Sequence, residues 1–370
     1  MLPHWMQPGW IKRARLSPIG LDLGAREIKA AQLMRGSDGA WKVIASAIIP
    51  REQGNDVALS AQIARVRGVL DRRGFRGHGV VIAVPGAKLL ASNLELPQRA
   101  AETPLDDIAR IEFCRTHKQP AEALEFDYWD LPAPARATRA THVMGVGCTI
   151  ADSEPIVDAC EAAGLDVIAA DVDGCALTRA CSPMLAPTGE ITAILDLGWQ
   201  STRLFVVHQS IVTYRRALEG YGMERLSRTV SEQLEIDAEV VDHLFRTSGL
   251  NEPSPADDES TVAEEARRLV RSHLDAVVAE VLTSLSYAAH QYPDAPVRRV
   301  LLVGGAASVP GVVEYLAAML GVDTRLVRVS AVTSGDAAAD EYDAAGVLAL
   351  GLAQFVEQLV NEPVAQVASA

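Results

Sequence analysis

The most constraining feature of this chain is a short pattern that occurs near its beginning and again in its middle. In residues 19–29 an apolar run leads into Asp22, turns at Gly24 and resumes as a second apolar run. In residues 193–207 the same Asp-Leu-Gly sequence returns at Asp196 and Gly198, again between two apolar runs. Short apolar runs separated by a glycine turn predict β-hairpins. We therefore expect two hairpins, each with an aspartate and a glycine at its tip.

Two such tips together suit the binding of a nucleotide phosphate tail. Glycine lets backbone N–H groups approach phosphate oxygens closely, and aspartate can hold a hydrated Mg²⁺ ion. The alternative for any single tip is an ordinary turn, in which the aspartate hydrogen-bonds to its own backbone. The repetition of the pattern is what favours a phosphate site over two unrelated turns.

A third segment, residues 299–321, reads as a buried strand, a double glycine at Gly304 and Gly305, a short loop and an amphipathic helix. The double glycine would allow a ribose or a flat ring to lie against the backbone. Alone, the segment reads more simply as a strand-to-helix turn that needs glycine for packing. Its position after the two hairpins makes it a candidate nucleotide contact.

The order of these three segments resembles the two phosphate motifs and the adenosine motif of the actin, Hsp70 and sugar-kinase ATPase superfamily. Within it, the chain is similar to the PilM type of type IV pilus assembly protein, an FtsA-like family. The similarity is carried by further segments at Val80–Pro85, Leu94–Pro97, Phe126–Leu131, Ala163–Leu165, Asp171–Leu177, Tyr214–Gly222 and Leu348–Leu352, and spans roughly residues 18–358. It implies an α/β, actin-like ATPase fold: two duplicated α/β domains around a nucleotide cleft, with an FtsA-like inserted subdomain.

The resemblance also implies ATP with Mg²⁺ as the ligand of the cleft. It assigns Mg²⁺ to Asp22 and Asp196, phosphate to Gly24, Ala25, Lys29 and Gly198, and the adenosine side to Gly304 and Gly305. It gives Asp173 the catalytic position, where relatives orient the attacking water. Two alternatives stay open: Lys29 could be a lysine at an outer strand edge, and Asp173 could be a helix N-cap.

Ala25 stands where many superfamily members have serine or threonine, so a hydroxyl that could reach the γ-phosphate is missing. We therefore expect ATP hydrolysis to be slow or absent, and the sequence does not decide whether the chain is an enzyme.

The resemblance divides the chain into several parts. We expect an N-terminal arm at 1–17, a first core subdomain at 18–84 and 166–188, an inserted subdomain at 85–165, a second core subdomain at 189–238 and 294–360, a small adenine-side subdomain at 239–293 and a tail at 361–370. Periodicity adds local detail: residues 59–73 form a predicted helix that buries Ile63, Val66 and Leu70.

Composition excludes several classes of protein. The chain has 370 residues, of which 49% are hydrophobic, so it can bury a large core. Its net charge of −14 argues against a general nucleic-acid binder. No apolar run is long enough to span a membrane, and the five cysteines show no zinc or disulfide spacing. Trp5 and Trp10 beside basic residues could mark a membrane-surface arm, but a loosely ordered terminus is the simpler interpretation.

Three classes of function compete. The resemblance favours a cytoplasmic ATP-binding scaffold of a type IV pilus or related secretion machine, peripheral to the inner membrane only through its partners. Those partners would be the cytoplasmic N-terminal peptide of a PilN-like inner-membrane protein and other machine components, with the peptide in a groove near Val80–Pro85 and Phe126–Leu131. The alternatives are a small-molecule kinase and a filament-forming ATPase of the FtsA or MreB type.

Overall fold

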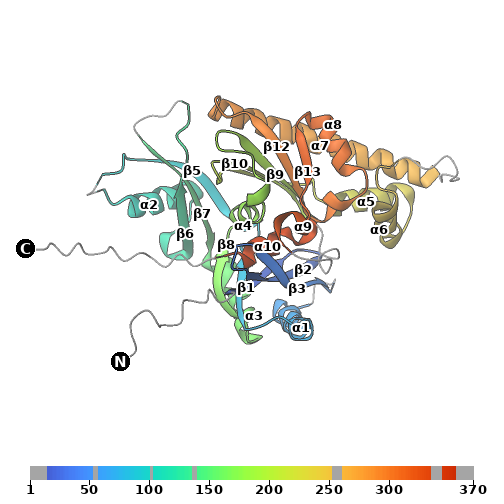
Figure 1. The fold of residues 1–370 in the computed structure, drawn as a ribbon, viewed down its shortest axis with the longest axis horizontal. Helices are drawn as coiled ribbons and strands as arrows, with labels where there is room; N and C mark the ends of the chain where they lie inside the picture. Colours follow the sequence, from blue (N-terminus) through green and yellow to red (C-terminus); the bar gives the residue numbers. More distant parts are fainter. Residues whose placement is uncertain are drawn as a thin grey trace, which may run out of the picture.

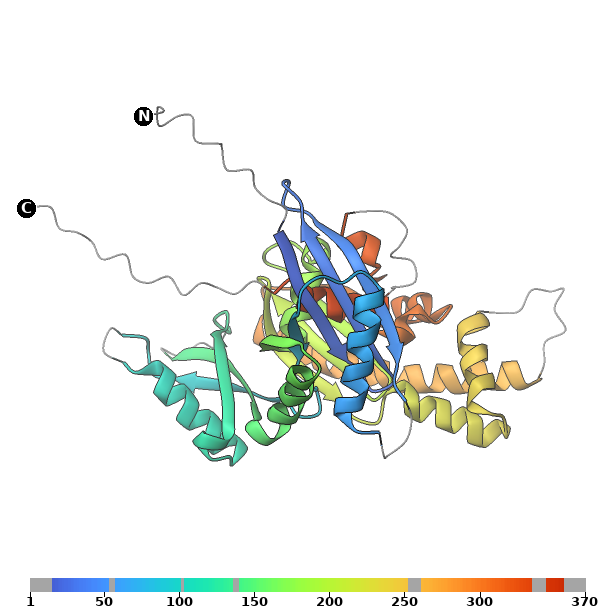
Figure 2. The ribbon, with the colours of Figure 1, turned by 90° about the horizontal axis from the view of Figure 1, so that it is seen from below.

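The computed structural model describes residues 15–52, 57–100, 103–135, 140–251, 261–334 and 344–355. Most of the expected N-terminal arm and all of the expected tail lie outside these ranges. The described part is built on two five-stranded sheets and one three-stranded sheet, connected by helices. The arrangement is shown in Figures 1 and 2.

The two large sheets repeat one plan. In each, three antiparallel strands are followed by two strands that run parallel to the innermost of the three. The first sheet has the order β3 (Trp41–Pro50), β2 (Glu27–Arg35), β1 (Arg15–Leu23), β4 (Gly79–Ala83), β8 (Asp166–Asp171). The second has the order β11 (Ile211–Leu218), β10 (Thr202–His208), β9 (Ile191–Leu197), β12 (Val297–Val303), β13 (Asp323–Leu326). Both predicted hairpins are present, as β1–β2 and β9–β10, and the predicted duplication is confirmed.

Helices α4 (Asp173–Ala180) and α10 (Val347–Ala353) lie between the two sheets and share one core with both. They approach very closely: a Cβ atom added to Gly351 would lie 2.0 Å from the carbonyl oxygen of Ala176. Only glycine permits this distance. The close packing ties the two sheets together behind the cleft.

The outer face of the first sheet is covered by α1 (Leu59–Arg72) and α3 (Ile150–Ala162). As the sequence predicts, α1 buries Ile63, Val66 and Leu70. Because these residues recur at helical spacing, they form one apolar stripe along the helix.

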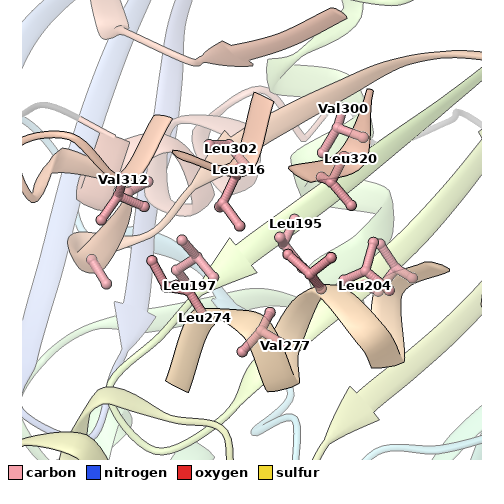
Figure 3. Packing of buried hydrophobic residues seen from close by; sticks show 14 of the residues in the cluster. Leu195, Leu197, Leu204, Leu274, Val277, Val300, Leu302, Val312, Leu316 and Leu320 are labelled. Atoms are coloured by element: carbon pink, nitrogen blue, oxygen red, sulfur yellow. The ribbon is translucent and has the colours of Figure 1, made fainter. Parts of the chain in front are cut away.

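The outer face of the second sheet packs against a larger group of helices. Leu195, Leu197 and Leu204 of the sheet meet Leu274 and Val277 of the long helix α7, as Figure 3 shows. The helices are α5 (Met223–Leu234), α6 (Ala238–Thr247), α7 (Thr261–Gln291) and α8 (Val312–Leu320). The short α9 (Val329–Val332), which follows β13, packs instead in the core shared by the two sheets. None of the helices in the described ranges is both long and apolar enough to cross a membrane.

A small sheet is inserted between β4 and β8. It consists of β5 (Leu90–Leu96), β7 (Thr141–Thr149) and β6 (Leu124–Asp130) in that order, with α2 (Leu105–His117) packed against it. The insertion also touches the second half of the chain, because the indole N–H of Trp129 donates to the carbonyl of Val212 at 2.9 Å. The boundaries that we expect for the subdomains stay a prediction.

Candidate functional site

A cavity of about 470 Å³ lies between the tips of the two hairpins. Its size is within the range of small-molecule sites. The predicted site residues that line it are Asp22, Gly24, Ala25, Lys29, Asp196, Gly198, Gly304 and Gly305. Asp173 is not among the lining residues. The folded chain thus brings together both hairpin tips and the double glycine, which are far apart in the sequence.

The first hairpin places a lysine and an aspartate in direct register. Asp22 on β1 is paired with Lys29 on β2, and the distance from Lys29 Nζ to Asp22 Oδ2 is 3.5 Å. The Lys29 side chain is only 15% exposed and lines the cavity rather than an outer edge of the sheet. Its charge therefore faces the space where an anionic ligand would lie.

Gly304, the first residue of the double glycine, is required by the way the chain turns at the cavity wall. Gly304 has a φ of +88°, and a Cβ atom there would lie 2.4 Å from Asp196 Oδ1. A side chain at this position would be strained and would also collide with the second hairpin. The turn consequently keeps its backbone close to Asp196.

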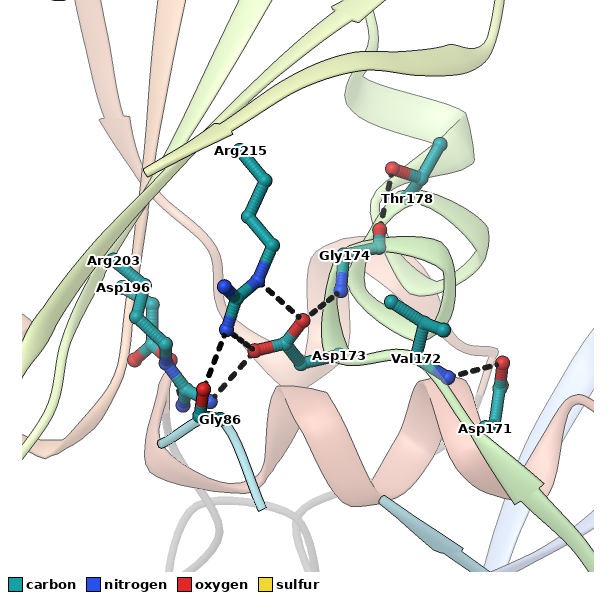
Figure 4. Close-up of polar contacts among 9 residues, drawn as sticks. All are labelled: Gly86, Asp171, Val172, Asp173, Gly174, Thr178, Asp196, Arg203 and Arg215. Atoms are coloured by element: carbon teal, nitrogen blue, oxygen red, sulfur yellow. Dashed lines mark hydrogen bonds and ion pairs between the residues drawn. The ribbon is translucent and has the colours of Figure 1, made fainter. Parts of the chain in front are cut away.

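The second hairpin has a cation in register with its aspartate, which the sequence analysis missed. Arg203 on β10 is paired with Asp196 on β9; its guanidinium forms ion pairs with Asp196 and, at 2.9 Å, with Asp173 (Figure 4). Burial raises the pKa of Asp196 above its ordinary value, Arg203 counteracts this, and the nearby charge of Asp22 raises it further. Cross-strand register would have revealed Arg203, since it lies opposite Asp196 once the hairpin turn is fixed.

Asp173 belongs to the same cluster of buried charges. It is the first residue of α4, whose N-cap is Val172. Its carboxylate accepts a hydrogen bond from the N–H of Gly174 at 2.8 Å and pairs with Arg203 and, at 3.4 Å, Arg215. Burial alone would raise the pKa of Asp173, but the two arginines hold it below its ordinary value. The water-orienting role of Asp173 stays a prediction.

The cluster joins three parts of the fold. Asp173 comes from the helix layer between the sheets, Arg203 and Arg215 come from the second sheet, and Arg215 also donates to the carbonyl of Gly86 at 3.0 Å. Figure 4 shows this contact; Gly86 lies in the segment that leads from β4 into the inserted sheet. The cavity wall is therefore connected through charged contacts to the insertion.

A second arginine that the sequence analysis missed lies across the cavity. Arg26, at the tip of the first hairpin, forms a two-pronged ion pair with Asp242 of α6. Its guanidinium also lies 4.4 Å from the ring centroid of Trp199, at the tip of the second hairpin. All three residues line the cavity. A cation–π contact and an ion pair thus join both hairpin tips to the helix on the other side.

The donor set at the hairpin tips fits Mg²⁺ in the presence of a phosphate ligand. The described residues contain no group of three or more acidic, histidine or cysteine ligands. Mg²⁺, however, is usually held by one or two carboxylates together with phosphates and water. Asp22 and Asp196 both line the cavity, and Asp22 is close enough for its charge to raise the pKa of Asp196.

Comparison with known proteins agrees with this geometry. The sequence profile of the family described as type IV pilus assembly protein PilM matches residues 20–353. The solved structure described as a PilM-PilN type IV pilus biogenesis complex is similar with a TM-score of 0.74 and 19% identity, covering 91% of this chain and 97% of that one. Ethanolamine utilization protein EutJ from Carboxydothermus hydrogenoformans is similar with a TM-score of 0.51 and 17% identity, covering 92% and 89%. The predicted actin-like ATPase fold is confirmed, and the chain belongs to the PilM family of type IV pilus assembly proteins.

Proposed function

We propose that this protein is an ATP-binding scaffold of a type IV pilus assembly machine and that it binds the cytoplasmic N-terminal peptide of a PilN-like inner-membrane protein. One observation supports the nucleotide site above all: two hairpin tips and a double glycine, distant in sequence, enclose a single cavity. The peptide partner is suggested by the similar solved structure, which is described as a PilM-PilN complex.

In this proposal the chain binds the phosphates mainly through its backbone. The N–H groups of Gly24, Ala25 and Gly198 would donate to phosphate oxygens, and Lys29 would neutralise part of their charge. Asp22 and Asp196 would hold Mg²⁺, which neutralises and orients the phosphate oxygens when it is bound.

We further infer that bound ATP is hydrolysed slowly or not at all. The methyl group of Ala25 cannot donate a hydrogen bond to the γ-phosphate. Both oxygens of the Asp173 carboxylate are already bonded, to Arg203, to Arg215 and to the N–H of Gly174. Asp173 also does not line the cavity, so it is poorly placed to orient a water there. ATP would then set the shape of the scaffold rather than drive it through cycles.

Replacing Lys29 with methionine tests the nucleotide site. Removing the ammonium group leaves the phosphate charge less compensated, and we expect the affinity for a fluorescent ATP analogue to fall about tenfold, equivalent to about 1.4 kcal/mol. The control is Lys42→Met on β3, since Lys42 does not line the cavity. Equal affinities for wild type and Lys29→Met would reject the assignment of Lys29, and the absence of binding by wild type would reject the function itself.

The peptide proposal rests on the outer strand of the small sheet. Among the described residues β6 pairs only with β7, so its other edge has backbone groups that an extended peptide could use. Glu125 and Asp127 are exposed and alternate along β6, which places them on one face. Short cytoplasmic ends of inner-membrane proteins are rich in lysine and arginine, and these carboxylates would complement such a peptide.

Reversing these two charges should weaken peptide binding. For the double variant Glu125→Lys and Asp127→Lys, we expect the affinity for the cognate peptide, of micromolar order, to fall about tenfold. Calorimetric titration measures it, with Glu154→Lys and Asp158→Lys on α3 as the matched control of exposed acids. If both double variants bind the peptide as wild type does, the peptide does not bind at this edge of β6.

A further inference from the structure

An arginine-rich surface lies at the end of the first sheet that is remote from the cavity. Within residues 65–76 the only acidic residue is Asp71, and the arginines are Arg65, Arg67, Arg72, Arg73 and Arg76. The chain as a whole has a net charge of −14. A concentration of positive charge in such a chain creates a local field opposite in sign to that of the rest of the molecule.

Three of these arginines have no acidic partner among the residues that the structure describes. Arg65 pairs with Glu52 at 3.0 Å and Arg67 with Asp71 at 2.9 Å. Arg72, Arg73 and Arg76 are exposed, and none of them forms an ion pair within the part of the chain that the structure describes. Their charges are therefore available to an external anion.

Hydrogen bonds fix the backbone of Arg76 beside the beginning of β1. The side chain of Gln32 on β2 donates to the carbonyl of Arg76 at 2.7 Å and accepts from its N–H at 2.8 Å. The same amide donates to the carbonyl of Ser17 at 3.1 Å. Leu16, which precedes Ser17, is an exposed large apolar side chain, with 43% of its surface accessible. Arg35 is the last residue of β2 and is paired with Arg15 at the beginning of β1, so it lies at the same end of the sheet. Its side chain is also exposed.

We call the set of Leu16, Arg35, Arg72, Arg73 and Arg76 the basic end. It lies where β1 begins, whereas Asp22 near the end of β1 lines the cavity. A strand of this length extends over roughly 25 Å. The basic end and the nucleotide cavity are thus at opposite ends of the first sheet, and a ligand at one leaves the other open.

From this placement we propose that the basic end contacts the surface of an anionic phospholipid membrane. Each arginine near such a surface is attracted by the negative headgroups, and an exposed leucine beside them can enter the interface. This direct contact would supplement the recruitment through partners that the sequence predicts, and it does not depend on nucleotide binding.

Lipid is favoured over nucleic acid because the exposed Leu16 offers an apolar contact that a phosphate backbone cannot use. Bound to a membrane in this way, the protein would direct its nucleotide cavity away from the bilayer.

Vesicle co-sedimentation tests the proposal with the full-length protein. Vesicles of phosphatidylglycerol mixed with phosphatidylcholine are compared with vesicles of phosphatidylcholine alone, for wild type and for the triple variant Arg72→Gln, Arg73→Gln, Arg76→Gln. We expect wild type to bind only the anionic vesicles and the triple variant to lose about a hundredfold in affinity, about fivefold for each arginine. The matched control is Arg225→Gln, Arg268→Gln, Arg271→Gln, which removes the same charge from exposed positions in the second half.

The outcomes separate the alternatives. Retained binding by the control together with loss in the triple variant supports the basic end as the contact. The proposal is overturned if wild type does not bind anionic vesicles, or if both triple variants lose affinity equally, which would reflect net charge alone. It is also overturned if a single-stranded RNA oligonucleotide binds wild type through these arginines and the vesicles do not. Thermal unfolding of each variant confirms that it is folded, since these side chains are exposed.

Discussion

Replacing Asp173 with asparagine is expected to lower the free energy of unfolding by about 3–5 kcal/mol. The carboxylate is fully buried and pairs with Arg203 and Arg215. Asparagine has nearly the same shape but no charge, so both guanidinium groups would remain in the interior with less compensation. Chemical denaturation monitored by circular dichroism measures the difference. An exposed pair gives the contrast: for Asp323→Asn, whose carboxylate is 38% exposed beside Arg299, we expect less than about 1 kcal/mol.

The effect of Asp173 should also depend on pH in a defined direction. Its pKa in the folded protein is lowered, because the two arginines outweigh the effect of burial. The stabilisation is therefore fully present above the pKa of an unfolded aspartate, about 3.9, and is lost as the pH falls through the lower folded value. The difference in stability between wild type and Asp173→Asn should consequently shrink in acid below about pH 4. A difference that stays constant, or grows, as the pH falls would show that the arginines do not hold this carboxylate in its charged form.

The second large effect is expected at Gly305, where a side chain should block the cavity without disturbing the fold. A Cβ atom on Gly305 would meet no other heavy atom within 4 Å, and the backbone there has no positive φ. The residue is exposed and lines the cavity. Leucine at this position should therefore fill space that the nucleotide needs, and we expect the affinity for ATP to fall at least about a hundredfold, equivalent to about 2.7 kcal/mol.

A graded series makes this prediction specific. Gly305→Ala should reduce affinity less than Gly305→Leu, while thermal unfolding of the ligand-free proteins should be nearly unchanged. Gly68→Leu on α1 is the control, because an added Cβ there makes only an ordinary contact, 3.5 Å from Arg72 Nη1. If Gly305→Leu binds nucleotide as tightly as wild type, the ligand does not use this side of the cavity.

The parts of the fold that the sequence predicts are those with a strong local signal. Apolar runs around Asp22 and Asp196 predict the hairpins, and the helical spacing of Ile63, Val66 and Leu70 predicts the buried face of α1. Strand β13 was missed because Asp323–Leu326 has only four residues and two of them are charged. Edge strands of this kind gain their conformation from pairing with a neighbour, which a single sequence does not display.

The site residues that could be predicted are those whose role follows from a short motif of neighbouring residues. The Asp-Leu-Gly tips and the double glycine were identified in this way, and all of them line the cavity. Arg203 was missed because its role depends on which residue it faces across the strand pair. Arg26 was missed because Asp242, its partner, is brought near only by the fold of the second half. Contacts between distant segments follow from packing, and no local pattern reports them.

The ion pair between Arg26 and Asp242 would affect the rates at which a ligand binds and dissociates rather than its affinity. It connects the first hairpin tip to α6 across the cavity, with Trp199 beneath the guanidinium. For a nucleotide that entered past Arg26 and Asp242, the ion pair would have to open, which would slow entry and departure together and leave their ratio unchanged. A scaffold built in this way would exchange its nucleotide only as fast as the ion pair between Arg26 and Asp242 opens. It would keep one assembly state through brief changes in the surrounding ATP concentration.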